Sequence, residues 1–220
     1  MHNVSEEFLS LHYVAVPAQP WPALEQAWLP RLPAGKRTHV ARLRYPADRN
    51  ASLLGVALLA AAYQRRGERF DPGRLIYPAR GKPTIAGGAD FSIAHAAGLA
   101  VCALASAGRV GVDLEAADSV STKVLRRALG PAEWARVASG ALDATDAWVM
   151  TEAVIKAAGL GIAAAGRVRL GEDSGSIDDR PLRLVRVPLA AGQRLWLAHE
   201  LAQGAVEVVG HDGREFAPLP

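Results

Sequence analysis

Two stretches of this sequence predict helices that are largely buried, and strand-like segments follow each of them. Residues 52–64 are apolar almost all round, and Asp48 and Asn50 just before them are typical of helix starts. Residues 144–158 form a second long helical pattern, which ends at Gly159. Because buried helices need a sheet or other helices to cover them, the pattern predicts an α+β protein with two similar halves.

The strands predicted around these helices are short and bounded by turn residues. They are residues 90–95, 99–105, 108–115, 168–170, 182–187, 194–201 and 205–209. Residues 173–179 are rich in Gly, Ser and Asp and predict a surface loop.

A short echo and the distribution of charge place the boundary between the halves near residue 105. The tripeptide Ile-Ala-His at 93–95 returns as Leu-Ala-His at 197–199. Residues 1–105 hold 12 Lys and Arg against 7 Asp and Glu, whereas residues 106–220 hold 13 against 15. The predicted domains are therefore a basic half, 1–105, and a mildly acidic half, 106–220.

Composition excludes several classes of protein. With 50% hydrophobic and 21% charged residues, the 220-residue chain predicts a folded protein with a sizeable core. The single Cys102 lies in an apolar run, which favours an inert buried thiol and a reducing, cytoplasmic compartment. The longest apolar run, 53–63, covers about half of a bilayer span, so no membrane segment is expected.

The isoelectric point of about 9.3 raises the question of nucleic acid. The basic residues lie in short groups with little aromatic interleaving, which favours a compact phosphate ligand over a nucleic acid. A basic surface with no ligand at all stays open as the alternative.

Residues 108–115 carry the most informative pattern. Strand alternation places the two valines and the leucine on one face and Gly111, Asp113 and Glu115 on the other. Two adjacent carboxylates repel each other unless a cation lies between them, and hard oxygen donors suit Mg²⁺. A solvated strand end is the alternative for an isolated Asp-x-Glu pair.

The second helix carries charges on one flank. Glu152 and Lys156 are one turn apart, beside a stripe of apolar residues. An ordinary surface ion pair would give the same spacing. Trp148 and Ile155 border the pair, however, and an idle ion pair in apolar surroundings would be costly.

Two further segments present positive charge. The turn Arg-Gly-Lys-Pro at 80–83 offers an ammonium group ahead of His95 at a strand end, and residues 36–44 carry cations at helical spacing. These groups could meet a phosphate. A structural histidine and a merely solubilising helix are the alternatives.

Taken together and in this order, the segments resemble the 4'-phosphopantetheinyl transferases, in particular the double-length Sfp (surfactin-synthetase-activating) type. The family motifs G-[IV]-D-x-E, W-x-x-K-E-A-x-x-K, G-K-P and F-x-[IL]-S-H are matched at residues 111–115, 148–156, 81–83 and 91–95. The resemblance runs from about residue 36 to 160. The shorter holo-acyl-carrier-protein synthase type, about half this length and trimeric, fits less well.

The resemblance implies a fold of two α+β halves related by a pseudo-twofold axis, with coenzyme A in the cleft between them. It implies an enzyme that transfers the 4'-phosphopantetheine group of coenzyme A to a serine of an apo acyl or peptidyl carrier protein. The reaction depends on Mg²⁺ and releases 3',5'-ADP. Because one chain supplies both halves of the cleft, a monomer is expected.

The resemblance also implies roles for individual residues. The magnesium ligands would be Asp113, Glu115 and Glu152, with Lys156 on the pyrophosphate. Proton acceptance would fall to Glu152, to Glu133 or to metal-bound water. The residues expected to bind coenzyme A are Lys36, His39, Arg42, Ser52, Lys82, Pro83 and His95.

At four positions the sequence departs from the family pattern. Thr151 and His39 stand where lysines are usual, Ala94 replaces a serine, and Ala51 replaces an arginine for which Arg49 or Arg42 could substitute. A lost charge-assisted phosphate contact costs roughly 1.5–3 kcal/mol, so about ten- to hundredfold weaker coenzyme A binding is expected.

Two alternatives to an enzyme remain at this point. One is a non-catalytic coenzyme A or carrier-protein binding module derived from this family, and the other is a basic nucleic-acid-binding protein. The retained carboxylates argue against the first, because without a metal they would repel a pyrophosphate. The sequence leaves open which carrier protein is the substrate.

Overall fold

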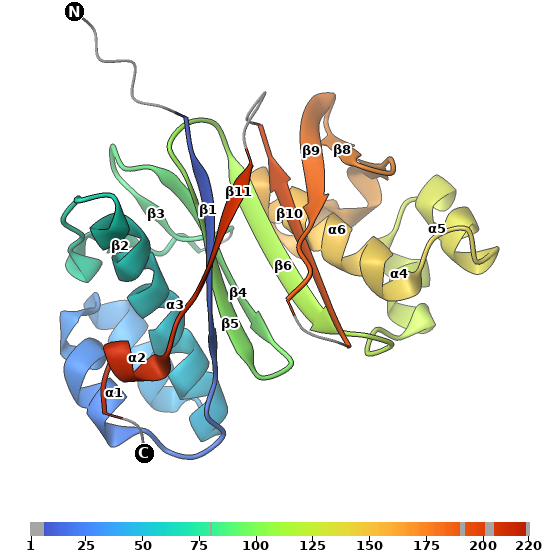
Figure 1. The fold of residues 1–220 in the computed structure, drawn as a ribbon. Coiled ribbons are helices and arrows are strands. Elements are labelled where there is room, and N and C mark those ends of the chain that lie inside the picture. Colours follow the sequence, from blue (N-terminus) through green and yellow to red (C-terminus); the bar gives the residue numbers. More distant parts are fainter. Residues whose placement is uncertain (1–6, 80, 190–191, 201–204, 219–220) are drawn as a thin grey trace, which may run out of the picture.

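The computed structural model describes residues 7–79, 81–189, 192–200 and 205–218. Two β-sheets lie next to each other in the middle of the molecule, and helices cover the outer side of each (Figure 1). The predicted α+β class is confirmed.

The first half contains a long buried helix, α3 (Pro46–Arg65), against a four-stranded sheet. The helix begins at Pro46, six residues before the predicted start, because Pro is favoured at the first helical position. Its apolar side chains pack on β5 and on helix α1. The elements of this half are β1 (Leu9–Ala15), α1 (Pro22–Trp28), α2 (Ala34–Arg42), α3, β2 (Leu75–Ile76), β3 (Thr84–Ile85), β4 (Asp90–Ala96) and β5 (Leu99–Ala105), with 3₁₀ turns at Leu29–Arg31 and Pro72–Arg74.

The second half repeats this plan around helix α6 (Ala144–Ala157). Asp143 caps the helix by accepting a hydrogen bond from the backbone N–H of Asp146 at 2.9 Å. The elements are β6 (Val110–Ala116), α4 (Thr122–Ala128), α5 (Pro131–Ala138), α6, a 3₁₀ helix at Ile162–Arg167, β7 (Val168–Leu170), β8 (Ser174–Ile177), β9 (Arg180–Arg186) and β10 (Gln193–His199). Strand β8 lies within residues 173–179, so the prediction of a surface loop there was wrong. Residue 201, the predicted end of the strand that forms β10, lies outside the described residues.

The two sheets share one pattern of pairing. In each half the first strand pairs antiparallel with the last, which pairs with the strand before it, giving β1-β5-β4 and β6-β10-β9. The predicted similarity of the halves therefore has a topological basis. The echo between residues 93–95 and 197–199 has none, because it falls on β4 and β10, which are not equivalent strands.

A separate hydrophobic core lies between the two sheets and joins them. Side chains of β1, β4 and β5 pack against Val110, Val112 and Leu114 of β6 and against β10. Hydrogen bonds also cross between the halves, because the backbone N–H groups of Val110 and Val112 donate to the side chains of Asp90 and Ser92 on β4. Strand β6 is thus buried on both faces, which positions its polar residues firmly.

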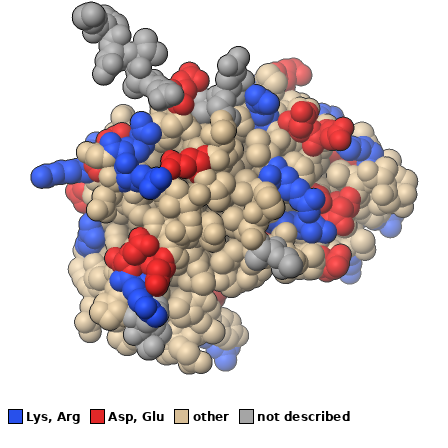
Figure 2. Space-filling model, in the orientation of Figure 1, with Lys and Arg blue, Asp and Glu red and all other residues tan. Residues whose placement is uncertain are grey.

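Charges of both signs are interspersed over both halves on the face shown in Figure 2. On this face no continuous basic surface forms. Cys102 is buried, and burial raises the pKa of its thiol, as expected for an inert core cysteine. Within the part of the chain that the structure describes, no helix is both long and apolar enough to span a membrane.

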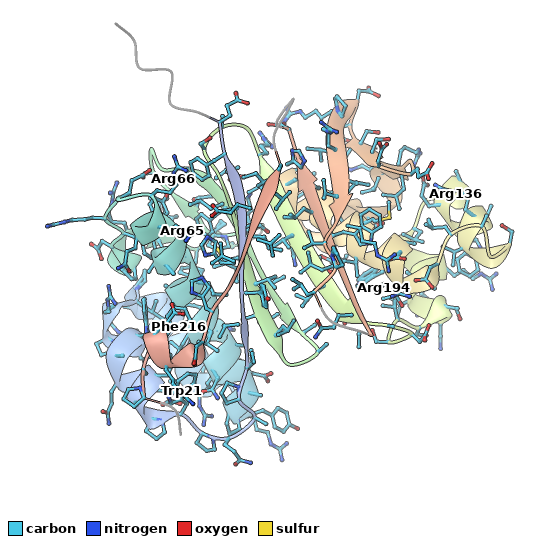
Figure 3. The ribbon with its side chains drawn as sticks, viewed as in Figure 1. Trp21, Arg65, Arg66, Arg136, Arg194 and Phe216 are labelled. Carbon is cyan, nitrogen blue, oxygen red and sulfur yellow. The ribbon has the colours of Figure 1, made fainter. Side chains whose placement is uncertain are left out.

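The end of the chain returns to the first half. Strand β11 (Val206–Gly210) pairs parallel with β1. A 3₁₀ turn (Gly213–Glu215) follows, and the indole N–H groups of Trp21 and Trp28 donate to the carbonyl oxygens of Pro218 and Phe216 (Figure 3). Residues 206–218 therefore lie with the first half, although the sequence predicted one continuous second half from 106 to 220.

Two histidines and a glutamate hold this tail against β1. The ring nitrogens His12 Nδ1 and His211 Nε2 are 2.8 Å apart, and His211 Nδ1 lies 2.9 Å from Glu215 Oε2. Burial, and then the charge of His211, lower the pKa of His12 from 6.5 to about 4. The folded protein therefore holds His12 neutral.

This arrangement predicts a loss of stability on mild acidification. Between pH 6.5 and pH 4, His12 is protonated in the unfolded chain but stays neutral in the folded protein. The free energy of unfolding therefore falls as the pH falls. Urea unfolding at several pH values should show a smaller slope in this window for His12→Gln than for the wild type. The exposed His39→Gln is the matched control, and an unchanged slope in His12→Gln would contradict the assignment.

Candidate active site

Strand β6 and helix α6 touch backbone to backbone at Gly111. A Cβ atom there would lie 2.0 Å from the carbonyl oxygen of Ala153 and 2.4 Å from the backbone nitrogen of Ala157. Only glycine permits this approach. The contact places against α6 the face of β6 that carries Asp113 and Glu115, which the alternation predicted to lie on the same side as Gly111.

An ion pair spans this contact. Lys156 Nζ of α6 lies 2.6 Å from Asp113 Oδ1 of β6, and Asp113 is only 7% exposed. The sequence alone allowed a surface pair of Lys156 with Glu152, but the ion pair found in the structure joins Lys156 to Asp113 across 43 residues.

Three carboxylates share this neighbourhood. Burial raises the pKa of Asp113, of Glu115 and of Glu152. The charge of Asp113 raises the pKa of both glutamates further, whereas Lys156 lowers the pKa of all three groups. The carboxylates are thus close enough to repel one another, and Lys156 compensates their charge.

His95 of the first half is influenced by charges of the acidic cluster. It lies near the end of β4, and burial lowers its pKa, with further lowering by the charges of Lys156 and Lys36. Asp48 and Asp113 act in the opposite direction. His95 therefore lies within electrostatic range of the acidic cluster and of Lys36 on α2.

The other predicted phosphate-binding residues lie on α2 and α3. His39 and Arg42 are exposed on α2, the helix that carries Lys36. Lys36 Nζ lies 5.2 Å from the ring centre of Tyr77, and burial lowers its pKa. Ser52 is buried on α3, and its hydroxyl oxygen has no hydrogen-bond partner among the described residues.

Lys82 lies beside Pro83 in the lining of a groove between the halves, and its ammonium group also has partners within the protein. Its role in binding coenzyme A stays a prediction. Its ammonium group is buried, forms an ion pair with Asp90 and donates to the carbonyl oxygen of Val110 at 2.7 Å. Burial lowers its pKa, and Asp90 opposes this effect. Lys82 thus ties the 81–83 turn to β4 and β6 and joins the two halves.

A groove begins at this turn. A Cβ at Gly81 would lie 2.6 Å from the carbonyl oxygen of Gly159, so the turn lies against the end of α6. Pro83, Ile93, Glu152, Lys156 and Leu160 are among the residues that line the groove. It therefore runs between the halves and reaches the acidic cluster.

Residues 109–201 match the family model of the 4'-phosphopantetheinyl transferase superfamily. The matched region holds β6 and α6, and hence the acidic cluster and Lys156. It covers less than half of the chain and supports the superfamily rather than the Sfp type within it. No curated protein matches the sequence.

The acidic cluster within the matched region has the donor chemistry that Mg²⁺ prefers, namely hard carboxylate oxygens. The repulsion among the carboxylates is what a divalent cation would relieve. Among the described residues, no group of three His, Cys, Asp or Glu side chains is already arranged to hold a metal ion. The magnesium site therefore stays a prediction, and the positive charge among these carboxylates is Lys156.

Glu133 does not join the cluster. Its buried carboxylate accepts a hydrogen bond from the backbone N–H of Leu170 at 3.3 Å and lies 3.5 Å from Arg169 Nη1. Helix α5, which carries it, lies at the outer end of the second half, away from the first half (Figure 1). The expectation that Glu133 accepts the serine proton is therefore wrong, because the side chain anchors α5 to β7.

The structure shows the surroundings of the residues that depart from the family pattern. Thr151 is fully buried and donates its hydroxyl to the carbonyl oxygen of Ala147, while Ala94 packs between the sheets. Ala51 is buried as well, and Arg49 is engaged with Glu25 and cannot substitute freely at the site. Apart from His39, these positions face the interior, and weaker coenzyme A binding stays a prediction.

Sequence reasoning missed one group beside the acidic cluster. The carboxylate of Asp146 on α6 accepts a hydrogen bond from Trp196 Nε1 at 2.8 Å and lies 3.6 Å from Arg194 Nε. Both partners belong to β10, whose alternation could have indicated that they share a face. Nothing in the sequence pointed to Asp146, because its two partners are 48 and 50 positions away from it.

We expect Gly111→Ala to cost about 3 kcal/mol or more in the free energy of unfolding, because the methyl group would overlap the backbone of α6. Denaturant unfolding measures this. Gly35→Ala is the matched control, since a Cβ there meets nothing within 4 Å and Ala favours helix α2 by up to about 1 kcal/mol. Equal stability of the two variants would contradict the close contact.

We expect Lys82→Met to lower the free energy of unfolding by about 2–3 kcal/mol, since it leaves Asp90 without its buried partner. Lys123→Met on the exposed face of α4 is the control and should change little. If Lys82→Met were as stable as the control, Lys82 would not be a structural tie.

Proposed function

We propose that this protein is an Sfp-type enzyme that transfers the 4'-phosphopantetheine group of coenzyme A to a serine hydroxyl of an apo carrier protein. The observation that carries the proposal is the pairing of buried Asp113 with Lys156, beside Glu115 and Glu152, at the end of a groove between the halves. The superfamily match over β6 and α6 supports it.

The groove and the charges suit the parts of coenzyme A. The pyrophosphate would lie at Lys156, the adenine against Pro83, and the 3'-phosphate near His95, Lys36 and Ser52. The electrostatic proximity of His95 to both lysines and the unpartnered hydroxyl of Ser52 support this orientation. His39 and Arg42, exposed on α2, would add positive charge at the phosphate end.

Asp113, Glu115 and Glu152 would hold Mg²⁺. When bound, the ion would neutralise negative charge that builds on the pyrophosphate oxygens during phosphoryl transfer. Lys156 would leave Asp113 and donate to the leaving phosphate oxygen, because the metal takes over the compensation of the Asp113 charge.

A serine hydroxyl is a weak nucleophile at neutral pH and needs a base within hydrogen-bond reach. Glu152 suits this role because it lines the groove in which the substrate would lie. With Glu133 excluded, the proton goes to Glu152 directly or through a bound water.

A non-catalytic coenzyme A or carrier-protein binding module is supported less well. Three mutually repelling carboxylates around a single ammonium group would oppose a pyrophosphate unless a further cation joined them. Because one chain provides both walls of the groove, we propose that the enzyme acts as a monomer. A cytoplasmic location stays a prediction.

The test combines the protein with coenzyme A, Mg²⁺ and a panel of apo acyl and peptidyl carrier proteins, and intact mass spectrometry reports the modification of each carrier. We expect EDTA to abolish transfer, and Asp113→Asn and Glu152→Gln each to lower its rate at least about a hundredfold.

Asp178→Asn is the matched control, since Asp178 forms an exposed ion pair with Arg167 outside the groove. Undiminished transfer by Asp113→Asn and Glu152→Gln would refute the assigned site. Coenzyme A binding without modification of any carrier would favour the binding module instead.

A further inference from the structure

One carboxylate at the start of α6 holds two side chains of β10. Asp146 Oδ1 accepts the Trp196 indole N–H at 2.8 Å, and Asp146 Oδ2 lies 3.6 Å from Arg194 Nε (Figure 3 labels Arg194). The Asp146 side chain is 14% exposed and that of Arg194 is 27% exposed, so water screens this ion pair only in part.

The two β10 residues are the cross-strand neighbours of the proposed metal ligands. In the antiparallel register, Trp196 lies opposite Asp113 and Arg194 lies opposite Glu115. Opposite residues share a face of the sheet with Cβ atoms about 5 Å apart, well within the reach of an arginine. Among the described side chains, however, the ion pair of Arg194 is with Asp146 and not with Glu115.

This choice of partner matters for the cation site. A guanidinium binds a carboxylate in a bidentate manner and would occupy the oxygens of Glu115 that a metal needs. We propose that Asp146 is a positioning residue that holds Arg194 away from Glu115 and so keeps this carboxylate available to a divalent cation. The inference rests on the proposed function, because it presupposes the magnesium site.

Asp146 also anchors α6 to β10 through Trp196, and this structural role can be separated from the electrostatic one. In Asp146→Asn the amide oxygen can still accept the indole N–H, but the negative charge that attracts Arg194 is lost. Arg194 would then turn to Glu115, the carboxylate opposite it in the strand register. Replacing Arg194 as well removes the competitor and leaves the helix anchor in place.

The experiment is calorimetric titration of Mg²⁺ into the protein saturated with coenzyme A and without any carrier, so that no turnover occurs. A titration of Mg²⁺ into coenzyme A alone is subtracted. We expect Asp146→Asn to bind Mg²⁺ about three- to fivefold more weakly than the wild type, the effect of one partly exposed ion pair. The double variant Asp146→Asn with Arg194→Met should regain the wild-type affinity.

Asp178→Asn, which breaks an Asp–Arg pair far from the acidic cluster in sequence, should bind Mg²⁺ like the wild type. Unchanged binding in Asp146→Asn would overturn the inference. So would weak binding that the double variant does not restore, because loosening of α6 would then be the cause. If the wild type itself binds no Mg²⁺, the metal assignment of the proposed function falls, and this inference with it.

Discussion

The backbone contact between β6 and α6 at Gly111 is the constraint on which the candidate site depends. Without a side chain at Gly111, the strand lies directly against the helix, and Asp113 comes within hydrogen-bond distance of Lys156. The opposite face of the same strand is packed into the core between the sheets. Held from both sides, β6 has little freedom to move its carboxylates, which is the preorganisation that charge stabilisation requires.

The charged side chains around this contact compensate one another as a group, and no single ion pair accounts for their arrangement. Lys156 lowers the pKa of all three carboxylates, whereas the charge of Asp113 raises the pKa of Glu115 and of Glu152. Asp146 gives Arg194, the residue opposite Glu115, a separate partner. Lys82, which lines the groove, also joins the halves through Asp90 and Val110. The ion pairs of Lys156 with Asp113 and of Lys82 with Asp90 therefore also hold together the elements that form the groove wall.

Much of this organisation could be predicted from local pattern. The period-two alternation of β6 correctly separated its apolar face from Gly111, Asp113 and Glu115, because a central strand between a sheet and a helix must follow that alternation. The two buried helices were correct as well. The failures share one physical origin. Glu133 and Thr151 stand at positions in the sequence that suggest a function, but whether their side chains point toward the groove depends on packing between elements. The strand β8 was missed because its Gly and Ser residues are typical of loops, and only pairing with β7 and β9 makes it a strand.

The sequence by itself determined the α+β class, the two buried helices and the order of the acidic and basic motifs, since these follow from periodicity and residue type within short segments. Only the tertiary structure decided which charges meet. Ion pairs such as Lys156 with Asp113, or Arg194 with Asp146, join residues that are 43 and 48 positions apart. Their partners depend on strand register and on how closely a helix can approach a strand, and both are set by packing across the whole domain.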